Sequence, residues 1–420
     1  MKVPISPQSN MLQSWSELLQ VAMGEDPYLD LSNSAPEMIA GMEVVRASRR
    51  AMATLFEIMI PAQNPKAQLG VLDGLDLIDQ CEERLSIYLE DSEVSLANRY
   101  AFEKPVSLSA ELYHLLEYAT TISRETEGAF DIASGALSRI WGFSQRQGRF
   151  PTISERMQAM SRSGVRYVLL NRHQSTVKYL RQGLEINLGA IGKGFALDRA
   201  ALLLRNKWQI EQGLLHSGNS TILAIGGRIY SPRKFQDHSK NSNTYQNSIS
   251  AEAAGDLSKQ NFLFPYQPLE DNTTPKNRLL HGWPVSLRHP WQNSSSNKNQ
   301  NLGTIYLQNE ALGTSAINFQ FFEHEGKKYG HILDPRRGFP AERVAQVSVI
   351  APSATLADAL STAFYVLGPE KTGIYCKSHP EIAAIILLNQ EEHKVDNPSF
   401  ITFNLKPDHF IPSHKTEYNR

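Results

Sequence analysis

Leu184-Glu-Ile-Asn-Leu-Gly-Ala-Ile-Gly-Lys-Gly194 and the following Phe195-Ala-Leu-Asp-Arg-Ala-Ala-Leu-Leu-Leu204 decide the fold of this chain. Their pattern predicts a strand over residues 184–188, a glycine-rich turn, and a helix over residues 195–204. Glycines let the backbone approach a bound group closely, and the amides at the start of a helix attract anions. Lys193 adds a positive charge there. The stretch is therefore typical of a phosphate cradle.

The alternative is a tight strand-to-helix connection that carries an exposed lysine. The spacing differs from that of a Walker loop, because Gly194 rather than Ser or Thr follows Lys193. It also differs from the dinucleotide-binding fingerprint. On this stretch alone, both interpretations stay open.

The rest of the chain mixes helices and strands without regular alternation. A long helix is predicted by the spacing of Leu72, Leu75, Ile78 and Leu85, which would share one buried face. A second helix is expected over residues 108–124. Strands are expected at Ala53–Ile60, Tyr167–Leu170, Thr176–Leu180, 221–230 and Trp283–Leu287. This order favours an α+β fold over a doubly wound parallel sheet.

The length of 420 residues exceeds that of a usual single domain. We expect an N-terminal appendage over residues 1–45, with a short amphipathic helix around Trp15, and a main domain over residues 46–380. A C-terminal strand and tail would occupy residues 381–420. The segments 231–277 and 292–301 are rich in Ser, Asn, Gln and Lys, and are predicted to be polar insertions.

Composition excludes several classes of protein. The net charge of −1 gives no support to a general nucleic-acid role. Two cysteines cannot form a disulfide framework or a cysteine-rich zinc site. No apolar run approaches the roughly 18 residues of a membrane span, and the N-terminus has neither the apolar core of a signal peptide nor a cysteine for a lipid anchor. The chain is therefore expected to be cytoplasmic, without an integral membrane segment.

Asp358 and Thr362 are four residues apart in the alanine-rich segment Ala357-Asp-Ala-Leu-Ser-Thr362. On a helix they would share one face. A carboxylate and a hydroxyl are oxygen ligands, which suit Mg²⁺ better than zinc. The alternative is an exposed aspartate beside a threonine that bonds to its own helix.

Two further blocks could carry chemistry. His331 lies in His331-Ile-Leu-Asp-Pro335 at a predicted strand end, where it could act as an acid or base or be only a polar surface group. In Gly128-Ala-Phe-Asp131, the glycine could end a helix. Phe130 could pack in a core or beside a flat ring, and Asp131 could bond a heterocycle edge or serve a turn.

Taken in order along the chain, these blocks resemble the ApbE family of FAD:protein FMN transferases. The likeness runs from about Met52 to Gly368. The blocks that carry it are Ala51-Met-Ala-Thr-Leu-Phe56, Leu85-Ser-Ile-Tyr88 with Ser92 and Asn98, Gly128-Ala-Phe-Asp131 with Leu137 and Trp141-Gly-Phe143, Gly189-Ala-Ile-Gly-Lys-Gly-Phe-Ala-Leu-Asp198, His331–Gly338 and Ala357–Thr362.

The resemblance implies a T-fold-like α+β enzyme with mixed sheets and packed helices, which uses Mg²⁺ to transfer the FMN half of FAD to a Thr or Ser hydroxyl of an acceptor protein, with release of AMP. It implies a Mg²⁺ site made by Asp358, Thr362 and the carbonyl of Ala190. His331 would be catalytic, by assisting proton transfer or positioning the phosphate. The FAD site would be lined by Met52, Tyr88, Ala129, Phe130, Asp131, Asn187, Lys193 and Ile332.

Three positions depart from the family pattern. Asn187 stands where aspartate is common, Ser217-Gly-Asn219 replaces Gly-Gly-Asn, and Thr314-Ser-Ala316 replaces Thr-Ser-Gly. Two alternative functions follow. One is an FAD pyrophosphatase that yields FMN and AMP with water as acceptor, and the other is a non-catalytic flavin-binding carrier or assembly protein.

Overall fold

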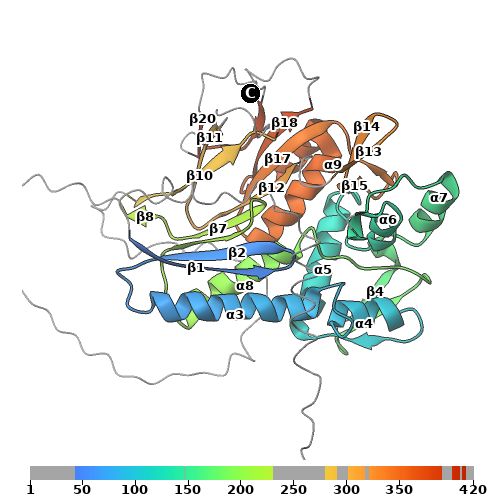
Figure 1. The fold of residues 1–420 in the computed structure, drawn as a ribbon, viewed down its shortest axis with the longest axis horizontal. Coiled ribbons are helices and arrows are strands. Elements are labelled where there is room, and N and C mark those ends of the chain that lie inside the picture. The colour runs from blue at the N-terminus through green and yellow to red at the C-terminus, as the bar shows by residue number, and fades with distance from the viewer. Residues whose placement is uncertain are drawn as a thin grey trace, which may run out of the picture.

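A single antiparallel sheet organises the protein (Figure 1). The computed structural model describes residues 43–145, 147–229, 280–290, 301–316, 321–389, 400–406 and 409–412. The eight strands, in spatial order, are β1 (Val44–Ala51), β2 (Thr54–Pro61), β6 (Gly213–Ser217), β7 (Thr221–Ile225), β12 (Ala311–Ala316), β17 (Val344–Ala351), β18 (Ala383–Leu388) and β19 (Phe400–Phe403). The predicted N-terminal helix and the polar insertions at 231–277 and 292–301 lie outside the described residues, apart from Asn301, which is the first residue of β11.

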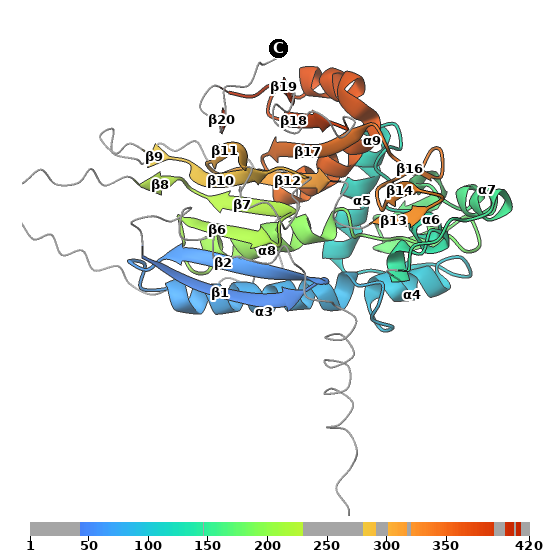
Figure 2. The same cartoon turned by 45° about the horizontal axis from the view of Figure 1, so that its top comes forward.

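Three helices cover one face of this sheet (Figure 2). They are α3 (Ala67–Leu85), α8 (Gly192–Asn206) and α9 (Ala354–Ser378). Because side chains alternate along a strand, Phe56, Ile58 and Ile60 of β2 all point into the core under these helices and are fully buried. Within the described residues, no helix is both long and apolar enough to cross a membrane.

A small second sheet covers the opposite face. It consists of β10 (Trp283–Arg288), β11 (Asn301–Leu307) and β20 (Phe410–Pro412). Met59, which alternates with the helix-facing residues of β2, packs there in a core that includes the fully buried Trp283. The central sheet is therefore buried on both faces, which accounts for the nearly continuous apolar strands of this protein.

A lobe of shorter elements lies beside the end of the sheet (Figure 1). Its members are α4 (Glu93–Tyr100), α5 (Ala110–Glu125), α6 (Gly135–Ile140), α7 (Ile153–Ser161) and the three-stranded sheet β3 (Val106–Ser107), β5 (Thr176–Tyr179) and β4 (Val168–Asn171). The remaining strands form three two-stranded pairs, namely β8 (Arg228–Ile229) with β9 (Leu280–His281), β13 (Phe321–His324) with β14 (Lys327–Gly330), and β15 (Leu333–Asp334) with β16 (Phe339–Pro340). Two short 3-10 helices, Phe143–Gln145 and Val165–Tyr167, complete the described elements. As predicted, Gly128 ends α5: it has φ of 75°, and its amide donates to the carbonyl of Ser123 at 2.8 Å.

The α+β prediction is confirmed, since every strand pair within the described residues is antiparallel and no βαβ unit of a doubly wound sheet forms. The boundary predicted at residue 380 falls between α9 and β18. Because β18 and β19 continue the central sheet, the chain on both sides of that boundary contributes to one core.

The strand predicted over residues 184–188 is wrong. The segment has no strand partner; instead, the side chain of Asn98 bonds both backbone groups of Ile186, accepting from its amide at 2.7 Å and donating to its carbonyl at 2.8 Å. The carbonyl of Glu185 accepts from the amide of Gly135 at 3.0 Å. Side-chain and isolated backbone bonds thus satisfy groups that a ladder would otherwise pair.

The buried face predicted for α3 is correct except at Leu72, which is 45% exposed, while Leu75 is 1% exposed. The apolar face is completed by Val71 and Cys81 instead.

We expect Leu75→Ala to lower the free energy of unfolding by about 2–5 kcal/mol, because it leaves a cavity under the sheet. Leu72→Ala is the matched control and should change that energy by less than about 0.5 kcal/mol. Equal losses in chemical denaturation would contradict this assignment.

Candidate active site

The glycine turn and the start of α8 form a compact loop under a lysine. The amide of Gly192, the first residue of α8, donates to the carbonyl of Leu188 at 2.7 Å, so the helix begins three residues before the predicted Phe195. Lys193 Nζ donates to the carbonyl of Gly189 at 2.9 Å. The ammonium group therefore folds back over the turn and adds its charge to the positive end of the helix dipole.

Asp358 of α9 lies directly against this helix start. Its side chain is 6% exposed, and its Oδ2 accepts from the amide of Gly194 at 3.2 Å and lies 3.5 Å from Lys193 Nζ. Its Oδ1 accepts from the hydroxyl of Thr221 at 3.1 Å. The alternative of an exposed aspartate is therefore wrong: the carboxylate is buried, hydrogen-bonded and paired with a cation.

Thr362 lies one helical turn beyond Asp358, in a group of hydroxyls. Its Oγ1 is 3.4 Å from the Oγ of Ser315 on β12, which is in turn 2.9 Å from the Oγ of Ser361. Its hydroxyl thus contacts a side chain of the sheet, whereas the alternative interpretation had it bonded to its own helix. The carboxylate of Asp358 and the hydroxyl of Thr362 therefore both lie on the side of α9 that faces the sheet.

Glycines allow α9 to approach its neighbours this closely. A Cβ added to Gly194 would lie 2.1 Å from the carbonyl oxygen of Ala354, and one added to Gly313 would lie 2.2 Å from that of Ala357. Any side chain at either position would push the helix away from α8 or from β12. The contact between Asp358 and the start of α8 depends on this backbone-to-backbone packing.

The donor set at this position fits a hard divalent cation. The carboxylate of Asp358 accepts one protein hydrogen bond per oxygen, so each oxygen keeps a lone pair. Ala190 is half-buried in the glycine turn. The carbonyl of the preceding residue, Gly189, already accepts from the Lys193 ammonium group. Carboxylate, hydroxyl and carbonyl oxygens are the ligands that Mg²⁺ accepts. Among the described residues, no cluster of three His, Cys, Asp or Glu side chains offers a competing metal site.

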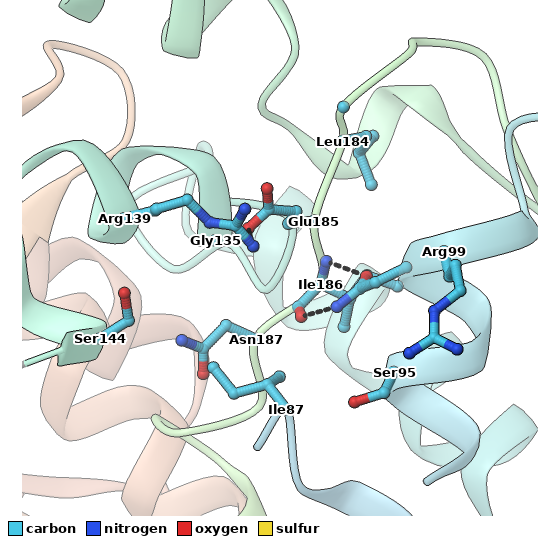
Figure 3. A pocket seen from close by; sticks show the side chains of 12 residues that line it. Ile87, Ser95, Arg99, Gly135, Arg139, Ser144, Leu184, Glu185, Ile186 and Asn187 are labelled. Atoms are coloured by element: carbon cyan, nitrogen blue, oxygen red, sulfur yellow. Dashed lines mark hydrogen bonds and ion pairs between the residues drawn. The ribbon is translucent and has the colours of Figure 1, made fainter. Parts of the chain in front are cut away.

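A cavity of about 320 Å³ opens beside the glycine turn (Figure 3). Asn187, Ile87 and Ser144 face the same space, with Arg139 and Arg99 on opposite sides of it. Asn187 is fixed by accepting from the amide of Gly189 at 2.9 Å, which links the cavity wall to the glycine turn.

Two further contacts shape this cavity. Tyr88 is 69% exposed, and its hydroxyl donates to the carbonyl of Ser144 at 3.1 Å, so it reaches across the rim. Arg139 pairs with Glu185 at 2.8 Å. Burial raises the pKa of Glu185, and the two nearby guanidinium groups of Arg139 and Arg162 oppose that shift.

His331 lies between β14 and β15, at the strand end that the sequence predicts. Its ring is half-buried and meets Phe143 edge-on, with ring centroids 6.5 Å apart. Phe143 precedes Ser144, which lines the cavity. A turn follows this strand end: the Asp334 carboxylate accepts from the backbone amide and the guanidinium of Arg336, and Gly338 has φ of 66°. The braced β15–β16 hairpin begins two residues after His331, and the ring contact with Phe143 joins the histidine to the chain that reaches Ser144.

The Ala129–Asp131 block lies deeper than the other predicted site residues. Ala129 and Phe130 are each 1% exposed, so the structure places Phe130 in the core. The oxygens of Asp131 accept from the amides of Ala133 and Val165 at 2.8 and 3.0 Å. Burial raises the pKa of Asp131, while these two bonds lower it. The carboxylate serves the turn, as the second interpretation of this block had it.

The two remaining predicted residues lie on connections. Met52 is in the two-residue turn between β1 and β2 with φ of 49°, and its amide donates to Glu82 at 2.7 Å, which ties the turn to the end of α3. Ile332 is 8% exposed and follows His331, with its carbonyl accepting from the amide of Ala341. The structure thus brings Lys193, Asp358 and Thr362 together, while the other predicted FAD residues are spread over the surrounding walls and core.

Sequence reasoning missed several participants. Thr221 and Ser315 come from strands whose apolar patterns hid them. Arg99 belongs to α4, a helix that was not predicted, and Asn98 of the same helix was named in a family block without a role. Asp198 stands inside the quoted glycine-rich block, yet its partner is α9, about 156 residues away along the chain. Gly194 and Gly313 could have indicated these contacts, because a glycine inside a helix or strand often marks a close approach of another backbone.

Comparison with known proteins agrees with this architecture. The model of the ApbE family matches residues 52–239 and 271–386. The FAD:protein FMN transferase of Treponema pallidum is 29% identical over 359 residues, which cover 83% of this chain and 86% of that protein. The enzyme of the same name from Escherichia coli K12 is 24% identical over 343 residues, covering 80% and 82%.

Solved structures share the fold. The ApbE protein of Thermotoga maritima superposes with a TM-score of 0.63 at 24% identity, covering 82% of this chain and 94% of that one. The flavin transferase ApbE of Vibrio cholerae superposes with a TM-score of 0.64 at 22% identity, covering 86% and 97%. With the family match spanning most of its length, the chain belongs to the ApbE family.

Proposed function

We propose that this protein is an FAD:protein FMN transferase, which uses Mg²⁺ to move the FMN half of FAD onto a Thr or Ser hydroxyl of an acceptor protein. The match to this chain covers 86% of the Treponema pallidum protein of this name and 82% of the Escherichia coli one. The observation that carries the proposal is the meeting of the Lys193 ammonium, the start of α8 and the buried Asp358 within 3.5 Å. Such a site suits a pyrophosphate, which needs both cationic groups and a metal.

Each group of this site has a distinct part in the proposed reaction. The acceptor hydroxyl oxygen forms a bond to the FMN-side phosphorus, the bond from that phosphorus to the bridging oxygen breaks, and AMP leaves with the bridging oxygen. Lys193 and the positive end of the α8 dipole stabilise the charge on the pyrophosphate oxygens. His331, held beside the cavity, accepts the hydroxyl proton or positions the phosphate.

Asp358, Thr362 and the carbonyl of Ala190 would hold the Mg²⁺, which when bound supplies Lewis-acid stabilisation of phosphoryl charge. The cavity beside Asn187 and Tyr88 would take part of the FAD, since both residues match family positions for that site and lie on its wall and rim. Of the remaining predicted FAD residues, Ala129, Phe130 and Ile332 are buried and Met52 and Asp131 are half-buried, and none of them is among the residues that line this cavity.

An FAD pyrophosphatase is the second candidate, because the same site could use water as the acceptor. The observation behind this alternative is the buried Ser217. It replaces a glycine of the family pattern, and its hydroxyl has no hydrogen-bond partner among the described residues. That substitution changes the strand end next to the β6–β7 turn, where Thr221 bonds Asp358.

One assay separates these functions. The full chain is incubated with FAD, Mg²⁺ and an acceptor flavoprotein carrying a Thr/Ser flavinylation motif, and the acceptor is then denatured. Transfer predicts a mass gain of one FMN on the acceptor with an equal amount of AMP. Free FMN with AMP would instead establish hydrolysis, and FAD binding without any AMP would establish a non-catalytic flavin carrier.

A further inference from the structure

A second carboxylate makes the contact between α8 and α9 reciprocal. Asp198 of α8 accepts from the amide of Ala354 through Oδ1 and from the amide of Thr355 through Oδ2, each at 2.8 Å. It also accepts from the hydroxyl of Thr355. Ala354 and Thr355 are the first two residues of α9, whose amides have no partner inside the helix.

Asp358 does the same in the opposite direction. It extends from α9 to the amide of Gly194 in the first turn of α8, four residues before Asp198. Each helix thus binds the N-terminal amides of the other through an aspartate. Between the two carboxylates, Gly194 and Ala354 meet backbone to backbone. Two contacts about one helical turn apart, that of Asp198 with the start of α9 and that of Asp358 with Gly194, therefore fix the position of Asp358 relative to the Lys193 turn.

We infer that Asp198 is a positioning residue for the divalent-cation and phosphate site at Asp358. Its bonds from two backbone amides and one hydroxyl hold the first turn of α9, and Asp358 follows directly after that turn. The inference rests on the proposed function, because it takes Asp358 to be a metal ligand. It assigns Asp198 no contact with FAD or metal.

The local N-cap of α9 cannot replace Asp198. Ser353 is that cap, and its hydroxyl accepts only from the amide of Leu356, at 3.2 Å. Without Asp198, α9 would still form, but the amides of Ala354 and Thr355 would lose the acceptors that tie them to α8. The first turn could then shift along α8, and the Asp358 carboxylate would move relative to Lys193 and Thr221.

The test measures cation binding rather than turnover. Mn²⁺, a paramagnetic substitute for Mg²⁺, is titrated into the full chain without FAD, and free Mn²⁺ is followed by its electron paramagnetic resonance signal. Loss of a residue that orients a metal ligand typically costs 10–100-fold in metal affinity. We therefore expect Asp198→Ala to weaken Mn²⁺ binding at least about tenfold. Asp198→Asn should lie between it and the wild type, because an amide keeps only one acceptor oxygen.

Ser109→Ala is the matched control for a general loss of stability. Ser109 is the N-cap of α5, and its hydroxyl accepts from the amide of Leu112 at 3.3 Å, within its own helix. Its removal deletes one helix cap and should lower the melting temperature. We expect this variant to bind Mn²⁺ like the wild type even where its melting temperature falls as far as that of an Asp198 variant.

The outcomes separate this inference from the proposed function. If Asp358→Ala binds Mn²⁺ as tightly as the wild type, the proposed metal role of Asp358 is wrong. If Asp358→Ala loses binding while both Asp198 variants keep it, only the positioning role is wrong. An equal loss in Ser109→Ala would also overturn that role. Should Asp198→Ala not fold, Asp198→Asn carries the same comparison.

Discussion

Asp358→Ala should reduce FMN transfer by roughly 10³-fold at saturating Mg²⁺, because Lewis-acid stabilisation of a phosphoryl group contributes several kcal/mol and each 1.36 kcal/mol is a factor of ten. Asp358 is the one carboxylate among the three expected ligands, and it also fixes the start of α8 through Gly194. Initial rates are measured across a Mg²⁺ titration, with AMP release as the readout. Thr362→Ala should lose less, since a hydroxyl carries no charge.

Asp73→Ala is the control for this prediction. Asp73 is a carboxylate of α3 that bonds Lys207 and Trp208 at 2.7 and 2.8 Å and lies outside the candidate site. It should keep the wild-type Mg²⁺ dependence. Full activity of Asp358→Ala at low Mg²⁺ would remove Asp358 from the ligand set. A melting temperature within the range of the control shows that the loss of activity is not a loss of fold.

His331→Ala should lower turnover by about 10²–10⁴-fold while leaving the affinity for FAD nearly unchanged, because a positioned acid or base acts mainly in the transition state. The histidine lies just before the β15–β16 hairpin and contacts Phe143, the neighbour of the cavity-lining Ser144. Turnover is measured at saturating FAD, and FAD affinity by quenching of flavin fluorescence. The expected split between the two is the signature of a catalytic group.

The matched variant is His173→Ala, since His173 is exposed in the connection between β4 and β5. It should match the wild type in both measurements. If His331→Ala instead abolishes FAD binding and keeps turnover at saturating FAD, the histidine is a binding residue, and another group must accept the hydroxyl proton.

Local pattern was enough to predict part of the fold, while β1, α4, β6, β12 and β17 are among the elements that it missed. The periodic apolar residues of α3 and α5, the strand that ends at Pro61, and the hairpin of β4 and β5 were all predicted, because burial of one face imposes a period of 3.6 or 2 on the sequence. The error at residues 184–188 has the same origin. An extended segment carries the apolar alternation of a strand whether its backbone bonds a neighbouring strand or, as here, the side chain of Asn98.

The site divides in the same way. Short-range spacing was sufficient to place Asp358 and Thr362 on one helix and to predict an anion-binding turn at Lys193, since both depend on residues a few positions apart. That the two meet was decided by tertiary structure: Gly194 and Gly313 let α9 touch α8 and β12, and Asp198 ties its first turn in place. The contacts between α8 and α9 join residues more than 150 positions apart. The residues around a glycine do not show which distant backbone segment will pack against it. Chain chemistry therefore determined which groups the site contains, and packing of the two helix starts determined that they form one site.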